Sequence, residues 1–350
     1  MQVIFRADAS IHIGSGHIMR CLTLADGLRN KGYGITFVCR ELPGNLISLI
    51  KAKSYSVYAL NWQDENNIFN WYKDVTETIN VIESNGLKTD LLIVDHYQLD
   101  SVWESAVRDY TKKIMVIDDL ADRKHDCDIL LDQNYYRDLN TRYHDLTPEN
   151  SLKLLGPKYA LLRKDFGEAR KSIRNRSGEI KTILISFGGG DCYKLTLQAI
   201  KAIVKLKQSK ISVDVVIGKA NPYKSEIIAQ CDSLAEFTLH IQTSRMADLM
   251  MKADLAIGAG GATSWERCVL GLPSILISLA DNQVAICNGL AELEGAFYLG
   301  KHQDINDNIL HQFLKKIVLS PNMIRNMANT CVNILDANGC DRLVSFLVEE

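Results

Sequence analysis

Short apolar runs alternate with longer amphipathic stretches along most of the chain. In the first half the apolar runs are continuous, as expected of strands buried on both faces of a parallel sheet. The strands predicted there are Val3–Ala7, Gly34–Cys39, Ser56–Leu60, Leu91–Asp95, Ile114–Asp118 and Ile129–Leu131. The helices predicted between them are His17–Lys31, Asn45–Lys51, Ile68–Ser84 and Ser101–Tyr110.

The same pattern resumes after a polar segment, Lys171–Lys181, which we interpret as a linker. The strands predicted beyond it are Thr182–Phe187, Val213–Ile217, Thr238–Ile241, Leu255–Ile257, Ser274–Ser278 and Phe297–Leu299. The helices predicted there are Lys194–Lys205, Tyr223–Gln230, Met246–Lys252, Ser264–Leu270, Asn282–Glu294, Ile305–Leu314 and Pro321–Leu335. This alternation predicts an α/β protein with two doubly wound, Rossmann-like domains, residues 1–175 and 176–350. Ligands are expected in an interdomain cleft, at the carboxyl ends of the strands.

Composition narrows the possible partners. The formal net charge of the 350 residues is -2, which gives no electrostatic argument for binding nucleic acid or an anionic membrane. The first residues lack the basic region of a signal peptide, and no apolar run approaches the roughly 20 residues that cross a bilayer. We therefore expect a cytoplasmic protein. The nine cysteines include no CxxC pair and are expected to be free thiols, and no Cys/His spacing indicates a zinc site.

The first candidate site is the turn Gly14-Ser15-Gly16-His17, which follows the segment Arg6-Ala7-Asp8 at the end of a predicted strand. Glycines let the backbone approach a ligand closely, and a helix start presents N–H groups and a partial positive charge to anions. That charge disfavours the imidazolium form, so His17 could accept a proton, and Arg20 one turn along acts in the same sense. A structural turn before a helix would explain the residues equally well.

Two further glycine stretches follow predicted strands, Ser186–Asp191 and Ile257–Glu266. Either could hold a phosphate group, and the first could also be a flexible connector. In the second, Glu266 on the first helical turn could accept both ribose hydroxyls, or it could simply be a favourable charge near the helix dipole. The candidate contact residues of the two stretches are Gly188, Gly189, Gly260, Gly261, Thr263, Ser264 and Glu266.

Polar triplets follow two other strands, Asp95-His96-Tyr97 and Asp281-Asn282-Gln283. Side chains at the carboxyl ends of parallel strands usually face the site, but these residues could also satisfy turn amides or cap a helix. Asp118-Asp119 ends a strand and could lie at the edge of a site. Asp126-Cys127-Asp128 matches the metal-binding Asp-x-Asp of one class of glycosyltransferases, but it precedes a strand and is interpreted as a solvated turn.

Taken in order along the chain, these motifs resemble one family, the PseG-type UDP-sugar hydrolases of pseudaminic acid biosynthesis. These enzymes have the two-domain GT-B architecture and are related to the glycosyltransferase MurG. The turn Gly-x-Gly-His-x-x-Arg with Arg-Ala-Asp before it is the most specific part of the resemblance. The glycine stretch that ends in Glu266 is shared by many GT-B enzymes and indicates UDP rather than hydrolysis. Residues 61–88 and roughly the last 40 residues match only loosely.

The resemblance implies hydrolysis of UDP-2,4-diacetamido-2,4,6-trideoxy-β-L-altropyranose in a pathway of flagellin glycosylation, by a monomer without cofactor or metal. It implies that His17 is the general base for an inverting attack of water on the anomeric carbon. Tyr97 and Asn282 would lie beside the reacting sugar, and Glu266 would contact the ribose. Because the diphosphate leaves as a stable anion, it needs charge stabilisation rather than a second acid. The other residues expected to contact the substrate are Arg6, Asp8, Gly14, Gly16, Arg20, Gly188, Gly189, Gly260, Gly261, Thr263, Ser264 and Gln283.

Three other functions stay open. A glycosyltransferase of the same fold would use an acceptor hydroxyl in place of water, and residues 61–72, with four aromatic side chains, are the segment most like an acceptor patch. A UDP-sugar 2-epimerase would also expel UDP, and a non-catalytic module would bind nucleotide without turnover. The sequence leaves open both the identity of the sugar and the choice between C–O and P–O cleavage.

Overall fold

The computed structural model describes residues 1–62, 69–188, 191–207 and 210–349. The chain forms two compact units. Unit 1 consists of Met1–Leu161 together with Asn338–Glu350, and unit 2 consists of Leu162–Ala337. Each unit contains one parallel sheet with helices on both faces, so the predicted α/β class with two doubly wound domains is confirmed.

Unit 1 is built on a sheet whose seven described strands are all parallel, in the order β3-β2-β1-β4-β5-β6-β7. The strands are β1 (Gln2–Ala7), β2 (Gly34–Arg40), β3 (Ser56–Leu60), β4 (Leu91–Asp95), β5 (Lys113–Ile117), β6 (Ile129–Asp132) and β7 (Leu152–Leu155). The winding reverses between β1 and β4, which makes the carboxyl ends of these two strands the expected ligand site of this unit.

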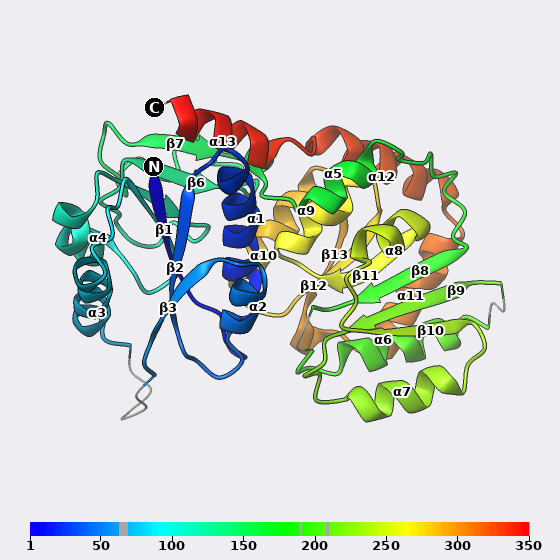
Figure 1. The fold of residues 1–350 in the computed structure, drawn as a ribbon. Helices are drawn as coiled ribbons and strands as arrows, with labels where there is room; N and C mark the ends of the chain where they lie inside the picture. The colour runs from blue at the N-terminus through cyan, green and yellow to red at the C-terminus, as the bar shows by residue number, and fades with distance from the viewer. Residues whose placement is uncertain (63–68, 189–190, 208–209, 350) are drawn as a thin grey trace. The chain divides into compact units, whose positions relative to one another are not determined.

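Helices cover both faces of this sheet (Figure 1). The helices are α1 (Gly16–Asn30), α2 (Ile47–Ala52), α3 (Trp71–Ser84), α4 (Ser101–Val107) and α13 (Gly339–Glu349). Side chains alternate across a strand, so Val3 and Phe5 face α1, α2 and α13, whereas Ile4 faces α3 and α4. Burial on both faces explains why these strands are continuously apolar.

Unit 2 repeats the design with six described strands, all parallel, in the order β10-β9-β8-β11-β12-β13. The strands are β8 (Thr182–Ser186), β9 (Ser212–Ile217), β10 (Phe237–Ile241), β11 (Leu255–Ala259), β12 (Ser274–Ser278) and β13 (Phe297–Lys301). The winding reverses between β8 and β11, the two strands that lead into the glycine stretches.

The helices of unit 2 divide between the two faces of its sheet (Figure 1). They are α5 (Lys164–Arg170), α6 (Leu195–Val204), α7 (Lys224–Asp232), α8 (Met246–Lys252), α9 (Ala262–Val269), α10 (Asn282–Glu292), α11 (Asp307–Val318) and α12 (Pro321–Ile334). The core of one face contains α6, α7 and α11, whereas α5, α8 and α9 pack together on the other.

The bounds of the units differ from those expected from the sequence, in two places. The segment interpreted as a linker lies within unit 2, where the buried guanidinium of Arg176 donates to the main-chain carbonyls of Met250, Ala253, Leu270 and Gly271. These carbonyls lie at the carboxyl-terminal ends of α8 and α9, where the helix dipole favours a cation. At the other end of the chain, α13 leaves unit 2 and packs against α1 in unit 1.

Most predicted elements are confirmed with bounds shifted by a few residues. Among the described residues, one strand and two α-helices were not predicted, namely β7, α5 and α13. The predicted start of the third helix, Ile68, lies outside the described residues, and the structure begins this helix at Trp71.

Candidate functional site

The centre of the site in unit 1 is a pair formed by His17 and Asp95. His17 is the second residue of α1, directly after the turn that follows β1, and Asp95 is the last residue of β4. His17 Nδ1 lies 2.5 Å from Asp95 Oδ1. Burial alone would raise the pKa of Asp95, but Arg20 and His17 beside it hold that pKa well below its usual value. An ionised carboxylate only accepts hydrogen bonds, so we infer that Nδ1 carries a proton and that Nε2 is the basic nitrogen of the neutral ring. Arg20 Nη2 also lies 3.3 Å from Nδ1, but it donates to Asp95 Oδ1 at the shorter distance of 2.6 Å.

Arg20 fixes this pair from the next turn of α1. Its Nε donates to Asp95 Oδ2 and its Nη2 to Asp95 Oδ1, both at 2.6 Å, and its Nη1 donates to Asp119 Oδ2 at 2.9 Å. The guanidinium is therefore engaged by carboxylates, which favours an indirect role beside His17 over the substrate contact expected from the sequence. The ring of Tyr97 meets the imidazole of His17 edge-on, with 4.5 Å between the ring centroids.

A second buried ionic layer lies beneath the turn. Arg6 is fully buried and donates to Asp8 and to Asp74 of α3, and the main-chain N–H of Arg40 donates to Asp8. Burial opposes the ionisation of Asp8, but Arg6 and His96 lower its pKa well below the usual value. This placement favours a structural role for Arg6 and Asp8, with the turn resting on them, over the direct substrate contact expected from the sequence.

The turn itself is open to solvent. Gly14 adopts a φ of +82°, and its N–H donates to the carbonyl of Ser10, whose hydroxyl accepts the N–H groups of His12 and Ile13. A Cβ on Gly16 would meet no described atom within 4 Å. The glycines thus leave open space next to His17, where a substrate could approach the imidazole.

The site in unit 2 is the glycine stretch between β11 and α9. A Cβ on Gly258 would lie 2.3 Å from the carbonyl oxygen of Ser186, and one on Gly260 would lie 2.2 Å from Sγ of Cys287, so both positions require glycine. Within residues 210–349, which the structure describes throughout, no acceptor is found for the N–H groups of Ala262 and Thr263. The start of α9 is therefore free to bind an anion.

The other glycine stretch is less suited to this task. The buried carboxylate of Asp191 accepts the N–H groups of Tyr193, Leu195 and Thr196, so the first turn of α6 is already satisfied by the protein. Gly188 is exposed with a φ of +84°, whereas Gly189 lies outside the described residues. Of the two phosphate turns predicted from the sequence, the one before α9 has the better geometry.

Glu266 and the start of α10 border the same stretch. The side chain of Glu266 is 16% exposed, and Arg163 Nε is 3.4 Å from its Oε1. Burial raises the pKa of Glu266, and Arg163 opposes that shift. Gln283 Oε1 accepts the N–H of Leu279, which ties the loop after β12 to α10. Asn282 begins α10 and thus belongs to unit 2, whereas His17 and Tyr97 lie together in unit 1.

One residue that supports the site, Asp74, was not predicted, whereas Asp119 belongs to the pair that was expected at the edge of a site. Asp74 and Asp119 anchor Arg6 and Arg20 respectively. Asp74 lies on the buried face of α3 together with Val75, Thr78 and Ile82, and an acidic residue at an apolar position of an amphipathic helix was the available signal.

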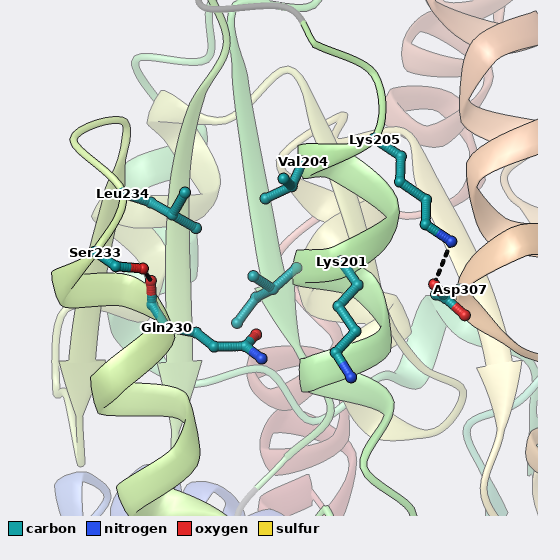
Figure 2. A pocket seen from close by; sticks show the side chains of 8 residues that line it. Lys201, Val204, Lys205, Gln230, Ser233, Leu234 and Asp307 are labelled. Carbon is teal, nitrogen blue, oxygen red and sulfur yellow. Dashed lines mark hydrogen bonds and ion pairs between the residues drawn. The ribbon is translucent and has the colours of Figure 1, made fainter.

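Other features of the chain fit a site less well. A groove of about 350 Å³ is lined by α6 and α7 and bordered by the ion pair of Lys205 with Asp307 (Figure 2). Apart from Asp307, its lining residues lie in or just after the carboxyl-terminal halves of α6 and α7. These halves lie at the edge of the sheet opposite the glycine stretches. The Asp-x-Asp motif pairs with Arg108. Among the described residues, no cluster of three or more His, Cys, Asp or Glu could hold a metal ion, and no helix is long and apolar enough to span a membrane.

Known proteins resemble this chain in sequence and in fold. Residues 182–336 match the family model described as "Glycosyltransferase family 28 C-terminal domain". In solved structures the fold is similar to MurG of Acinetobacter baumannii (TM-score 0.69, 17% identity, 100% of this chain and 99% of that one). It is also similar to UDP-GlcNAc 2-epimerase from Neisseria meningitidis (TM-score 0.67, 14% identity, 100% of both chains). The predicted GT-B architecture is thereby confirmed.

Three curated relatives match most of the chain. Uncharacterized protein MJ1062 of Methanocaldococcus jannaschii is 25% identical over 79% of this chain, which spans 55% of that protein's length. Spore coat polysaccharide biosynthesis protein SpsG of Bacillus subtilis is 23% identical over 99% of this chain and 98% of its own length. The UDP-2,4-diacetamido-2,4,6-trideoxy-β-L-altropyranose hydrolase of Campylobacter jejuni is 30% identical over 83% of this chain and 97% of its own length. The chain therefore belongs to the family of this UDP-sugar hydrolase, a GT-B family whose second domain is of the glycosyltransferase family 28 type.

Proposed function

We propose that this protein hydrolyses UDP-2,4-diacetamido-2,4,6-trideoxy-β-L-altropyranose to UDP and the free sugar. The observation that carries the proposal is the buried His17–Asp95 pair, which lies at the switch point of unit 1 and leaves Nε2 as the basic nitrogen. Support for the substrate comes from the relative in Campylobacter jejuni, whose name states this hydrolysis.

In the proposed reaction unit 2 holds the UDP part of the substrate. The free N–H groups at the start of α9 bind the diphosphate, and the partly exposed carboxylate of Glu266 accepts the ribose hydroxyls. Gly188 and Gly261, where a Cβ would meet open space, keep the approach to the nucleotide clear of side chains, and Gly260 lets the turn pack closely against Cys287. Thr263 and Ser264 follow at the helix start, where their hydroxyls can add to the binding of the diphosphate.

Unit 1 supplies the base. His17 Nε2 removes a proton from water as the water oxygen attacks the anomeric carbon. The bond between that carbon and the diphosphate oxygen breaks, and its electron pair leaves with UDP. A single displacement of this kind inverts the anomeric configuration. Asp95 stabilises the imidazolium that forms, and Tyr97 and Asn282 bind the sugar.

The test is a pair of histidine variants. His17→Ala should lower kcat by about 10²–10⁴-fold, the usual contribution of a general base, while the affinity for UDP changes little. His12→Ala, which removes an exposed histidine from the same turn, should leave kcat unchanged. Full turnover by the His17 variant would exclude this residue as the base.

A second candidate is a glycosyltransferase that uses the same UDP-sugar as donor, favoured by the family 28 match of unit 2. The two functions differ when no acceptor is present, because a transferase then releases little UDP. Incubation with the UDP-sugar alone, followed by measurement of UDP, distinguishes them.

A further inference from the structure

Arg267 of α9 is buried directly behind the glycine stretch that precedes this helix. Its side chain is 2% exposed. Its Nη2 donates to the carbonyl of Ala259 at 2.7 Å and to Ser264 Oγ at 3.0 Å. A Cβ on Gly258 would lie 3.1 Å from its Nη1, so the guanidinium rests on the bare backbone at the end of β11. It therefore touches the same residues that shape the proposed diphosphate site.

Arg267 forms no ion pair within the part of the chain that the structure describes, and its Nε is buried there without a hydrogen-bond partner. The carboxylate of Glu266 acts on Arg267 electrostatically, but its ion pair is with Arg163. Burial lowers the pKa of Arg267. Two other buried arginines, Arg6 and Arg20, pair with carboxylates, and a third, Arg176, donates to four main-chain carbonyls.

A buried cation without an ion-pair partner destabilises the folded protein. Because water is excluded, the electric field of this cation is screened weakly. This destabilisation decreases when an anion binds nearby. The groups near Arg267 that could bind an anion are the N–H groups of Ala262 and Thr263 and the hydroxyl of Ser264, a residue that is itself buried. Because Ser264 Oγ accepts from Arg267, its own proton is free to be donated to a ligand, and no acceptor for it occurs among the described residues.

We propose that Arg267 is a positioning residue of the diphosphate site, which orients the Ser264 hydroxyl as a donor and supplies the positive charge that the bound diphosphate compensates. The inference rests on the proposed function, which places the diphosphate of UDP at the start of α9. Arg267 acts through Ser264 and through its field, without touching the ligand. Its effect should therefore depend on the negative charge of the ligand.

This dependence separates a positioning role from a purely structural one. Arg267→Met should weaken UDP binding by about 10–100-fold, the range expected for lost interactions with a charged group, and leave uridine binding within about twofold. Arg267→Lys, which keeps the charge, should recover part of the loss. Arg245→Met is the matched control, because it removes an exposed cation from the start of α8 in the same unit.

Calorimetric titration of each variant with UDP and with uridine measures both affinities and so tests the role of Arg267. Equal losses for both ligands, or an unchanged affinity for UDP, would overturn the inference. If Arg267→Met does not fold, Ser264→Ala gives the same test, since it should lose UDP affinity and keep uridine affinity. A protein that binds UDP but does not hydrolyse the UDP-sugar would remove the proposed reaction and leave the role of Arg267 intact.

Discussion

Replacing Asp95 with asparagine tests whether this carboxylate sets the tautomer of His17. Asp95 is fully buried and accepts from His17 Nδ1 at 2.5 Å and from Arg20 Nε and Nη2 at 2.6 Å. An amide has one accepting oxygen, and its NH₂ group would face one of these donors. Arg20 cannot lose its protons, and its Nη2 shares Oδ1 with His17, so either orientation of the amide opposes one Arg20 N–H. When the NH₂ group faces Nδ1, the imidazole moves its proton to Nε2 and ceases to be a base there. The expected fall in kcat is the full contribution of the base, about 10²–10⁴-fold, with little change in KM.

The matched control is Asp119→Asn. Asp119 accepts from Arg20 Nη1 at 2.9 Å and has no recorded contact with His17. Both variants disturb the buried cation, so both should lose stability, by up to about 3–5 kcal/mol if the pairing fails completely. Only Asp95→Asn should lose most of its turnover. Initial rates of UDP release and urea unfolding of both variants give the comparison. The tautomer argument fails if Asp95→Asn stays within about threefold of the wild-type kcat, or if Asp119→Asn is equally slow.

Three other predictions concern stability and binding. Burial raises the pKa of Asp132 to about 7, whereas an aspartate in an unfolded chain has a pKa of roughly 3.9. The folded protein therefore binds the proton more tightly, and this stabilises the fold fully below about pH 4. The stabilisation is lost as the pH rises through about 7. Asp132→Asn should flatten that pH dependence in urea unfolding; an unchanged slope would contradict the assignment. Arg176→Met should lower the free energy of unfolding by about 2–4 kcal/mol in the same assay, because it leaves four main-chain carbonyls unpaired. Arg174→Met should lower it less, because the side chain of Arg174 is half-exposed. Glu266→Gln should raise KM about tenfold at nearly constant kcat; a fall confined to kcat would exclude a ribose contact.

The fold could be predicted largely because strands buried on both faces leave continuous apolar runs. The two errors of the fold prediction, a missed strand and a misassigned linker, have physical causes. The missed strand β7 is a short segment in which Lys153 interrupts the apolar run, and it pairs with β6 at the edge of the sheet. The polar segment around Arg176 looked like a linker, because the sequence does not show which carbonyls its arginines meet.

The site could be predicted only as separate turns. His17 was recognised from the glycines before it, but its partner Asp95 lies 78 residues away, and the two meet because β4 is the neighbour of β1 in the sheet. Local spacing carries no information about that strand order. The same holds for Asp74, which reaches Arg6 from α3. Arg267 was passed over because it lies on an ordinary helical turn, and its isolation from carboxylates is visible only in three dimensions.

The central claim is that this protein uses water, activated by His17, to release UDP from the sugar. An NMR time course with the UDP-altropyranose as the sole substrate tests it most directly. The account predicts that UDP and free sugar appear together without any acceptor, that the first sugar formed has the inverted anomeric configuration, and that His17→Ala slows both signals by about 10²–10⁴-fold. A substrate that stays intact until an acceptor is added, or a first product with retained configuration, would contradict it.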